Sequence, residues 1–269
     1  MAATSSDDDT LQSLARGLAV LRALGAAADG LTIAEAARAT DATRAAARRI
    51  LLTLVALGYV RQQGRRFAST PLVLELGAGL YAGAPLWGVA DAAVAELCAR
   101  LGETVSVGLL DGTDVVYAVR RDPPRPVTLG IRAGFRLPAH ASSMGWVLLA
   151  GLPEWQVEAF CRRGPFARLT ALTTTDPAAL AAGIAEAGRN GWAYLDSTAA
   201  EGVAGLSVPI ADPTGRTLAA LNVSTRVGRH GRAAALAELL PPLRDTATEI
   251  ARLLGRAVPL PWRATPPGR

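Results

Sequence analysis

Six arginines fall in one stretch of the chain, residues 42–74, that contains no aspartate or glutamate. Duplex DNA carries one negative charge per roughly 1.7 Å of its axis, so a surface that pairs with phosphates gains affinity by releasing counterions. The pattern predicts DNA binding. A merely solvated face is the alternative, because all 28 basic residues are arginine and a coding bias would also raise the number. The six are Arg44, Arg48, Arg49, Arg61, Arg65 and Arg66.

The residues around these arginines predict two helices joined by a turn. Thr32 and Glu35 form the Thr-x-x-Glu pattern of a capping box, so a first helix is expected from about Ile33. Residues 40–43 favour a turn, because Thr and Asp side chains bond to nearby backbone. A second helix is expected from Arg44 to a terminating glycine. Its apolar residues, spaced to face a core, are Ile50, Leu51, Leu54 and Leu57.

A basic hairpin is expected after the second helix. Tyr59–Gln62 and Arg65–Phe67 are short β-prone segments on either side of a Gln63-Gly64 turn. Helix, turn, helix and hairpin form the outline of a winged helix-turn-helix, whose second helix enters the DNA major groove. An amphipathic helix over residues 11–24 is expected to pack beneath. Its apolar stripe consists of Leu14, Leu18, Leu21 and Leu24.

We therefore predict a DNA-binding domain over residues 11–69. Side chains on the second helix can reach base edges, whereas those beside it and on the hairpin are placed to hold phosphates. The residues assigned to base edges are Thr43, Arg44 and Arg48. Those assigned mainly to phosphates are Arg49, Arg61, Arg65 and Arg66.

The composition limits the other functions. With 269 residues, half of them apolar, the chain can form one or two domains, and its net charge of +5 is compatible with a nucleic-acid partner. Cys98, Cys161, His140 and His230 are too few and too dispersed for a disulfide framework or a zinc site, so no metal or cofactor is predicted. No apolar run has the length of a membrane span, and the start is polar. The protein is therefore predicted to be cytoplasmic.

Beyond residue 69 the pattern predicts a linker helix and a mixed α/β or α+β domain. The linker helix, residues 70–84, either forms a dimer contact or packs on its own domain. The second domain is expected over residues 85–258, with a disordered tail at 1–10 and a Pro-rich tail at 259–269. Its helices are expected over residues 86–101, 142–149, 154–160, 177–190 and 233–254, with a kink in the last at Pro241-Pro242. Its strands are expected over residues 105–109, 115–119, 127–131, 192–195, 204–210 and 217–224.

The second domain lacks the common catalytic patterns. Ser142-Ser143-Met144-Gly145 is not Gly-x-Ser-x-Gly, and Gly77-x-Gly79 lacks a preceding strand and a third glycine. We therefore predict no catalytic residues and expect a sensing domain, which needs only a pocket with a few convergent polar groups. Two alternatives stay open: a small-molecule enzyme or scavenger with a degenerate helix-turn-helix, and a second domain that serves only for oligomerisation.

With these residues in view, the chain resembles the IclR family of bacterial transcription regulators over about residues 11–254. Five segments carry the resemblance, in this order: LQSLARGLAVLRAL, TRAAARRILLTLVALGYV, TPLVLELGAGL, LPAHASSMGWVLLA and ALNVST. The segments TRAAARR, PLW and SSMG are most similar to the branch that controls protocatechuate, 4-hydroxybenzoate and β-ketoadipate catabolism.

The resemblance implies an α+β protein: a winged helix-turn-helix, a linker helix and a GAF-like α/β effector-binding domain. It also implies homodimers or tetramers on palindromic promoter sites in double-stranded DNA, with a small organic acid, here an aromatic one, as effector. The family's effector lies between the sheet and a loop–helix element. The matching positions are Ser142, Ser143, Met144, Asp196, Gly205, Asn222 and Ser224.

Two positions depart from the family pattern and bear on the choice of ligand. Trp146 stands where Lys or Arg usually follows the glycine, and Thr198 stands where an acidic residue is common. Arginines could also pair with an effector carboxylate, because their guanidinium fork matches its geometry. The candidates are Arg120, Arg132 and Arg136, each with a surface role as the alternative.

Overall fold

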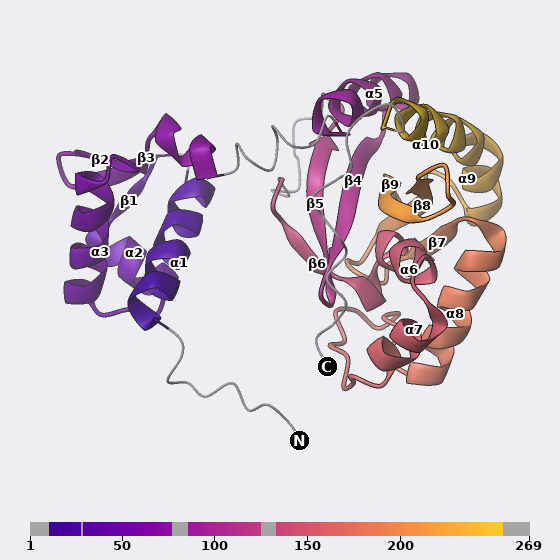
Figure 1. Cartoon of the computed structure of the whole chain (residues 1–269), viewed down its shortest axis with the longest axis horizontal. Helices are drawn as coiled ribbons and strands as arrows, with labels where there is room; N and C mark the ends of the chain where they lie inside the picture. The colour runs from indigo at the N-terminus through magenta and orange to yellow at the C-terminus, as the bar shows by residue number, and fades with distance from the viewer. Residues whose placement is uncertain (1–10, 28, 77–85, 125–132, 255–269) are drawn as a thin grey trace. The chain divides into compact units, whose positions relative to one another are not determined.

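The computed structural model describes residues 11–27, 29–76, 86–124 and 133–254, and it divides the chain into two units, Met1–Ala82 and Gly83–Arg269 (Figure 1). Each unit has its own sheet and its own buried core. The segments predicted as tails, residues 1–10 and 259–269, lie outside the described residues.

The first unit contains the predicted helix–turn–helix and hairpin. Thr32 caps α2: its N–H donates to Glu35 Oε2 at 2.8 Å, and Glu35 N–H donates to Thr32 Oγ1 at 3.3 Å. Thr43 caps α3 by accepting the N–H of Ala46 at 3.2 Å. The sheet has a further strand that was not predicted, β1, which pairs with β3. The elements are α1 (Gln12–Ala26), β1 (Leu31–Thr32), α2 (Ile33–Ala39), α3 (Arg44–Ala56), β2 (Val60–Gln63) and β3 (Arg66–Ser69).

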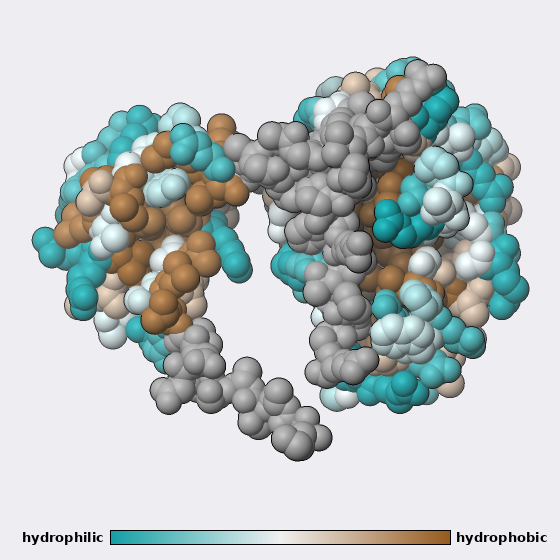
Figure 2. Space-filling view, in the orientation of Figure 1, coloured by the Kyte–Doolittle hydropathy of each residue, from teal (hydrophilic) through white to brown (hydrophobic). Residues whose placement is uncertain are grey.

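The predicted apolar faces of α1 and α3 are only partly buried. Leu24 of α1 and Leu51 and Leu54 of α3 lie in the core as predicted, together with Val20. Helical spacing identifies an apolar stripe, but it does not tell whether another element covers the whole stripe. Figure 2 shows apolar surface gathered on this unit. The residues wrongly predicted as buried are Leu14, 60% exposed, Leu18, 43% exposed, and Leu57, 59% exposed.

The predicted linker helix begins where expected, but as a tighter turn. Thr70 Oγ1 accepts the N–H of Leu72 at 3.3 Å, and residues Pro71–Leu74 form a 3₁₀ helix, η2. Residues 75 and 76 are α-helical, and the rest of the predicted helix, from residue 77, lies outside the described residues. Leu74 and Leu76 are 76% and 59% exposed.

The second unit is built on a six-stranded antiparallel sheet in the order β6-β5-β4-β9-β8-β7. Two predicted hairpins, β4–β5 and β8–β9, supply the four central strands. A short strand, β6, was not predicted, and the strand predicted over residues 127–131 lies outside the described residues. The strands are β4 (Thr104–Asp111), β5 (Asp114–Arg121), β6 (Arg136–Pro138), β7 (Ala193–Asp196), β8 (Val203–Ala211) and β9 (Thr217–Arg226).

Helices cover both faces of this sheet, and two cores result (Figure 1). One face packs on α5 and α10, and the other packs on α6, with α7 and α8 outside it. Strand β4 is buried over seven successive residues because both of its faces are covered. The helical elements are α5 (Leu86–Leu101), η3 (Ala139–Ala141), α6 (Ser143–Ala150), α7 (Glu154–Cys161), α8 (Pro177–Asn190), α9 (Arg232–Glu238) and α10 (Leu240–Leu254).

The helix predicted over residues 233–254 is two helices rather than one kinked helix. The break falls at Leu239, so Pro241 and Pro242 lie in the first turn of α10. A proline there costs little, because the first N–H groups of a helix have no partner within it. Within the described ranges, no helix has the length and apolar character needed to cross a membrane.

Candidate functional site

Four of the arginines predicted to contact DNA are exposed on α3 and on the hairpin. Arg44 and Arg48 lie one turn apart on α3, and Arg61 and Arg65 lie on β2 and at the hairpin turn. None of the four forms an ion pair with another described residue. Their positive charges are therefore available to an external anion. Thr43 uses its hydroxyl oxygen as the cap of α3, and its O–H remains a donor.

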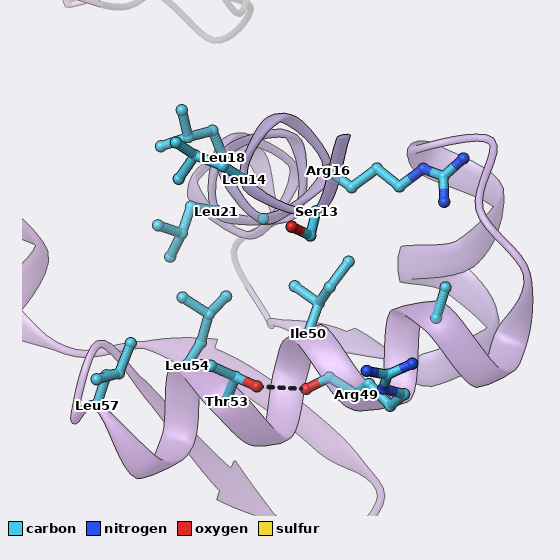
Figure 3. A pocket seen from close by; sticks show the side chains of 12 residues that line it. Ser13, Leu14, Arg16, Leu18, Leu21, Arg49, Ile50, Thr53, Leu54 and Leu57 are labelled. Carbon is cyan, nitrogen blue, oxygen red and sulfur yellow. Dashed lines mark hydrogen bonds between the residues drawn. The ribbon is translucent and has the colours of Figure 1, made fainter. Parts of the chain in front are cut away.

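Arg49 lies on the side of α3 that faces α1. With Arg16 it lines a groove of about 510 Å³ between these two helices. Figure 3 shows the two arginines at one end of the groove and leucines of both helices at the other. Arg49 is thus part of a different surface from Arg44, although it was predicted to hold phosphates beside the base contacts of Arg44.

Arg66 already has partners within the first unit. Its guanidinium donates to the carbonyl of Gly30 at 2.9 Å and lies 3.7 Å from the carboxylate of Glu35. The pairing of Thr32 with Arg66 across β1 and β3 brings these groups together. Arg66 therefore links the hairpin to the start of α2, and this contact was not visible in the local sequence.

In the second unit, a buried polar row crosses four neighbouring strands. Arg120 on β5 pairs with Ser106 on β4, Ser106 pairs with Asn222 on β9, and Asn222 pairs with Ser207 on β8. Residues directly paired across strands share one face of a sheet. This face also carries Tyr117, whose side chain packs in the core beneath α6. The row was only partly predicted, because Ser106 and Ser207 were not named.

Two glycines allow α6 to sit close to this face of the sheet. A Cβ on Gly205 would lie 2.7 Å from Ser143 Oγ. A Cβ on Gly108 would lie 2.8 Å from Met144 Sδ. Both distances are too short for a real side chain, so glycine is needed at both strand positions. The predicted residues Ser143, Met144 and Gly205 are therefore brought together with the polar row.

Hydrogen bonds join the start of α6 to the polar row. Ser143 Oγ lies 2.8 Å from Ser207 Oγ, and Asn222 Nδ2 lies 3.3 Å from Ser143 Oγ and 3.0 Å from Ser207 Oγ. Ser224 Oγ donates to Asn222 Oδ1 at 2.7 Å. Ser142 caps the helix by accepting the N–H of Gly145 at 3.0 Å. A buried polar group needs such partners, and this network gives both polar atoms of the Asn222 side chain at least one.

The start of α6 retains unused donors. Buried helix N-termini leave N–H groups without partners inside the helix. Here the amides of Ser143 and Met144 donate to no described residue, although both residues are buried. Unpaired amides and the positive end of a helix dipole favour an anion such as a carboxylate.

Arg120 forms the other end of the row. Its side chain is only 7% exposed, and it donates to both oxygens of Asp122, from Nε at 3.1 Å and from Nη2 at 2.7 Å. Burial raises the pKa of Tyr117, and the positive charge of Arg120 opposes part of that rise. The charge of Arg120 thus acts on Tyr117, and Asp122 neutralises it.

Two predicted effector residues lie away from the row. Asp196 on β7 pairs with Ala204 on β8, so the two residues share one face of the sheet. Leu206, two residues along β8, points to that same face and lies in the core with α5 and α10. Asp196 is therefore on the face opposite the polar row. Arg136 is held at the β4–β5 turn by Asp111 at 2.6 Å and Asp114 at 3.0 Å. These hydrogen bonds, led by the one to Asp111, raise the pKa of Arg136. The third candidate arginine, Arg132, lies outside the described residues.

The two positions that depart from the family pattern have structural roles. Trp146 Nε1 donates to the carbonyl of His140 at 2.8 Å, and its ring packs against Gly183 of α8. Thr198 Oγ1 donates to the carbonyl of Ala141 at 2.8 Å, and its own carbonyl accepts from Thr173 Oγ1 at 2.7 Å. Both residues therefore fix the loop that leads into α6.

A winged helix-turn-helix with exposed arginines, joined to a domain with a buried polar site, defines a two-domain class of ligand-responsive transcriptional regulator. Comparison with known proteins identifies the family within that class. Residues 13–64 match the IclR helix-turn-helix domain, and residues 81–252 match the C-terminal domain of bacterial IclR transcriptional regulators. The chain belongs to the IclR family of bacterial transcriptional regulators, so the predicted family and two-domain fold are confirmed.

Similar proteins are regulators over nearly their whole length. The Pca regulon regulatory protein of Pseudomonas putida is 36% identical over 94% of this chain and 87% of its own. The crystal structure of a transcriptional regulator from Rhodococcus sp. RHA1 is 43% identical, with a TM-score of 0.78 over 91% of this chain and 98% of that one. An IclR homologue from Microbacterium hydrocarbonoxydans, solved with 4-hydroxybenzoate, is 26% identical, with a TM-score of 0.75 over 90% and 98%. The names of such relatives support a regulator rather than an enzyme.

Proposed function

We propose that this protein regulates genes of aromatic-acid catabolism in the β-ketoadipate pathway, and that a small aromatic carboxylic acid controls its binding to DNA. The main support for the effector site is the buried polar row beneath α6. At one end of this row, the backbone amides of Ser143 and Met144 donate to no described residue. The name of the Pseudomonas putida relative and the 4-hydroxybenzoate in the Microbacterium structure support the class of acid.

The effector's carboxylate binds at the start of α6. The amides of Ser143 and Met144 donate to it, and the Ser143, Asn222 and Ser224 side chains form one polar wall of the site. The aromatic ring extends along the sheet face toward Arg120, past Tyr117. Asp196 and Arg136 stay outside this site, because other partners and the opposite sheet face hold them.

The DNA site consists of α3 and the hairpin. Thr43, Arg44 and Arg48 face base edges, while Arg61 and Arg65 hold phosphates. Arg66 acts from the edge of this surface, since it is held by Glu35 and Gly30, while Arg49 belongs to the groove between α1 and α3. A homodimer, or a tetramer of two dimers, presents two such surfaces to a palindromic site in the cytoplasm. The effector binds one arrangement of the pair more tightly and thereby changes its affinity for DNA.

A binding experiment tests this proposal against its rivals. Purified protein is titrated with 4-hydroxybenzoate and 3,4-dihydroxybenzoate by calorimetry, and with the DNA upstream of its own gene by fluorescence anisotropy. Saturable binding of an acid and of that DNA, without conversion of the acid, supports the regulator. Turnover of the acid without sequence-specific DNA binding supports an enzyme or scavenger. DNA binding without any acid binding supports an oligomerisation domain.

A further inference from the structure

Ser106 is the feature of the second unit that the fold does not explain. Its side chain is completely buried, and its Oγ has no hydrogen-bond partner. Every other buried side-chain oxygen or nitrogen of the described residues has a partner. Val105 and Val107 on either side face the opposite core, whereas Ser106 faces α6. Because burying an unpaired hydroxyl costs free energy, an apolar side chain at position 106 would stabilise the fold more. An unpaired buried hydroxyl is unfavourable for folding and calls for another reason to be there.

The two cross-strand neighbours of Ser106, Asn222 and Arg120, direct their hydrogen bonds to other groups. Asn222 uses its amide group for Ser143, Ser207 and the carbonyl of Leu206, and it uses its oxygen for Ser224. On the other side, Arg120 gives Nε and Nη2 to Asp122. The Ser106 hydroxyl is therefore free to donate to, or accept from, a group that enters the site.

We propose that Ser106 hydrogen-bonds a ring hydroxyl of the bound aromatic acid, and so selects hydroxylated acids over unsubstituted ones. This inference rests on the proposed function and adds the residue that sets its selectivity. Ser207, which contacts Ser143 at the start of α6, lies two strands from Ser106, about 10 Å at the usual strand spacing. A benzene ring with substituents at its two ends, and a hydrogen bond at each, spans such a gap.

The charges of the site decide which end of the ligand meets Ser106. The start of α6 offers unpaired amides and the positive end of a helix dipole, which suit a carboxylate. The positive charge of Arg120 is already balanced by Asp122, so the Ser106 end offers no net charge to an anion. A neutral hydroxyl fits there, and an analogue without it leaves Ser106 unpaired in the complex.

The test compares two ligands and three proteins by calorimetry. For the full-length protein, Ser106→Ala is expected to weaken binding of 4-hydroxybenzoate by roughly 5- to 10-fold, the size of one net hydrogen bond. Binding of benzoate, which lacks the hydroxyl, is expected to stay unchanged. Thr246→Val replaces a residue of α10 that is 8% exposed and lies outside the proposed site, so it serves as the control and is expected to alter neither affinity.

The melting temperature of the ligand-free proteins separates binding from folding. Ser106→Ala is expected to melt at the same or a higher temperature than the wild type, because the lost hydroxyl had no partner. Equal losses of affinity for both acids, or no loss for either, would overturn the role of Ser106 while leaving the proposed function standing. Failure of the wild type to bind either acid would overturn the proposed function and this inference together.

Discussion

At the scale of single residues, the environment of a side chain decides its role more than its type does. Arg65 and Arg66 are adjacent, and both were predicted mainly to hold phosphates. Arg65 has no ion pair with a described residue, whereas Arg66 is tied to Glu35 and Gly30. The capping box of Thr32 and Glu35 could be predicted, because its four residues are local. The bond to Arg66 could not, because strand pairing across distant positions creates it.

Substituting the two neighbouring arginines should have different effects on DNA binding and on stability. Arg65→Ala is expected to weaken binding to all DNA sequences and to lower the salt slope by about 1, because one phosphate contact is lost. Arg66→Ala is expected in addition to lower the melting temperature, since Glu35 and the carbonyl of Gly30 lose their partner. Anisotropy titrations at several salt concentrations and thermal unfolding measure both effects. An unchanged melting temperature for Arg66→Ala would contradict its linking role.

The carboxylate of Glu35 gives a pH dependence with a defined sign. The backbone N–H of Thr32, its hydroxyl and then Arg66 hold the pKa of Glu35 below its ordinary value of 4.5. A lowered folded-state pKa means that the stabilisation is present above the unfolded pKa and is lost as pH falls through the folded pKa. Between about pH 5 and pH 3, Glu35→Gln should therefore lose less stability than the wild type. Parallel denaturation midpoints for the two proteins across that window would contradict this.

At the scale of elements, periodicity predicted most helices and strands but not what covers them. Helix α8 has the predicted bounds, since Pro177 opens it and Gly191 closes it at a φ of +66°. The α1 stripe was predicted to be buried, yet Leu14 and Leu18 are exposed along the groove with α3. The polar row beneath α6 was found only in part, because it depends on the register of four strands. A serine between two valines in β4 was its one local signal.

Two glycines on α8 give opposite predictions for the same change. A Cβ on Gly183 would lie 2.2 Å from the Trp146 ring, which the His140 carbonyl holds, so Gly183→Ala should cost about 1–3 kcal/mol. A Cβ on Gly188 would meet Ala150 at an ordinary 3.5 Å, so Gly188→Ala should gain about 0.5–1 kcal/mol from helix propensity. Chemical denaturation of the two variants measures both. Shifts of the same sign would contradict the packing of Trp146 against α8.

At the scale of the whole molecule, two domains of different chemistry share one chain. The first presents arginines without an ion pair among the described residues, and the second encloses a polar row on one face of its sheet, beneath α6. The family and both domain types were predicted from sequence motifs, and comparison with known proteins confirmed them. The proposed coupling between effector and DNA would be reciprocal: an effector that changes the affinity for DNA by some factor has its own affinity changed by DNA by the same factor.

The most direct test of the account is a titration of labelled DNA from upstream of the gene with full-length protein, with and without saturating 4-hydroxybenzoate. Sequence-specific binding is expected, with an affinity that the acid shifts by roughly 5- to 150-fold, the usual range of allosteric coupling. Identical DNA affinity in the presence and absence of an acid that calorimetry shows to be bound would contradict it.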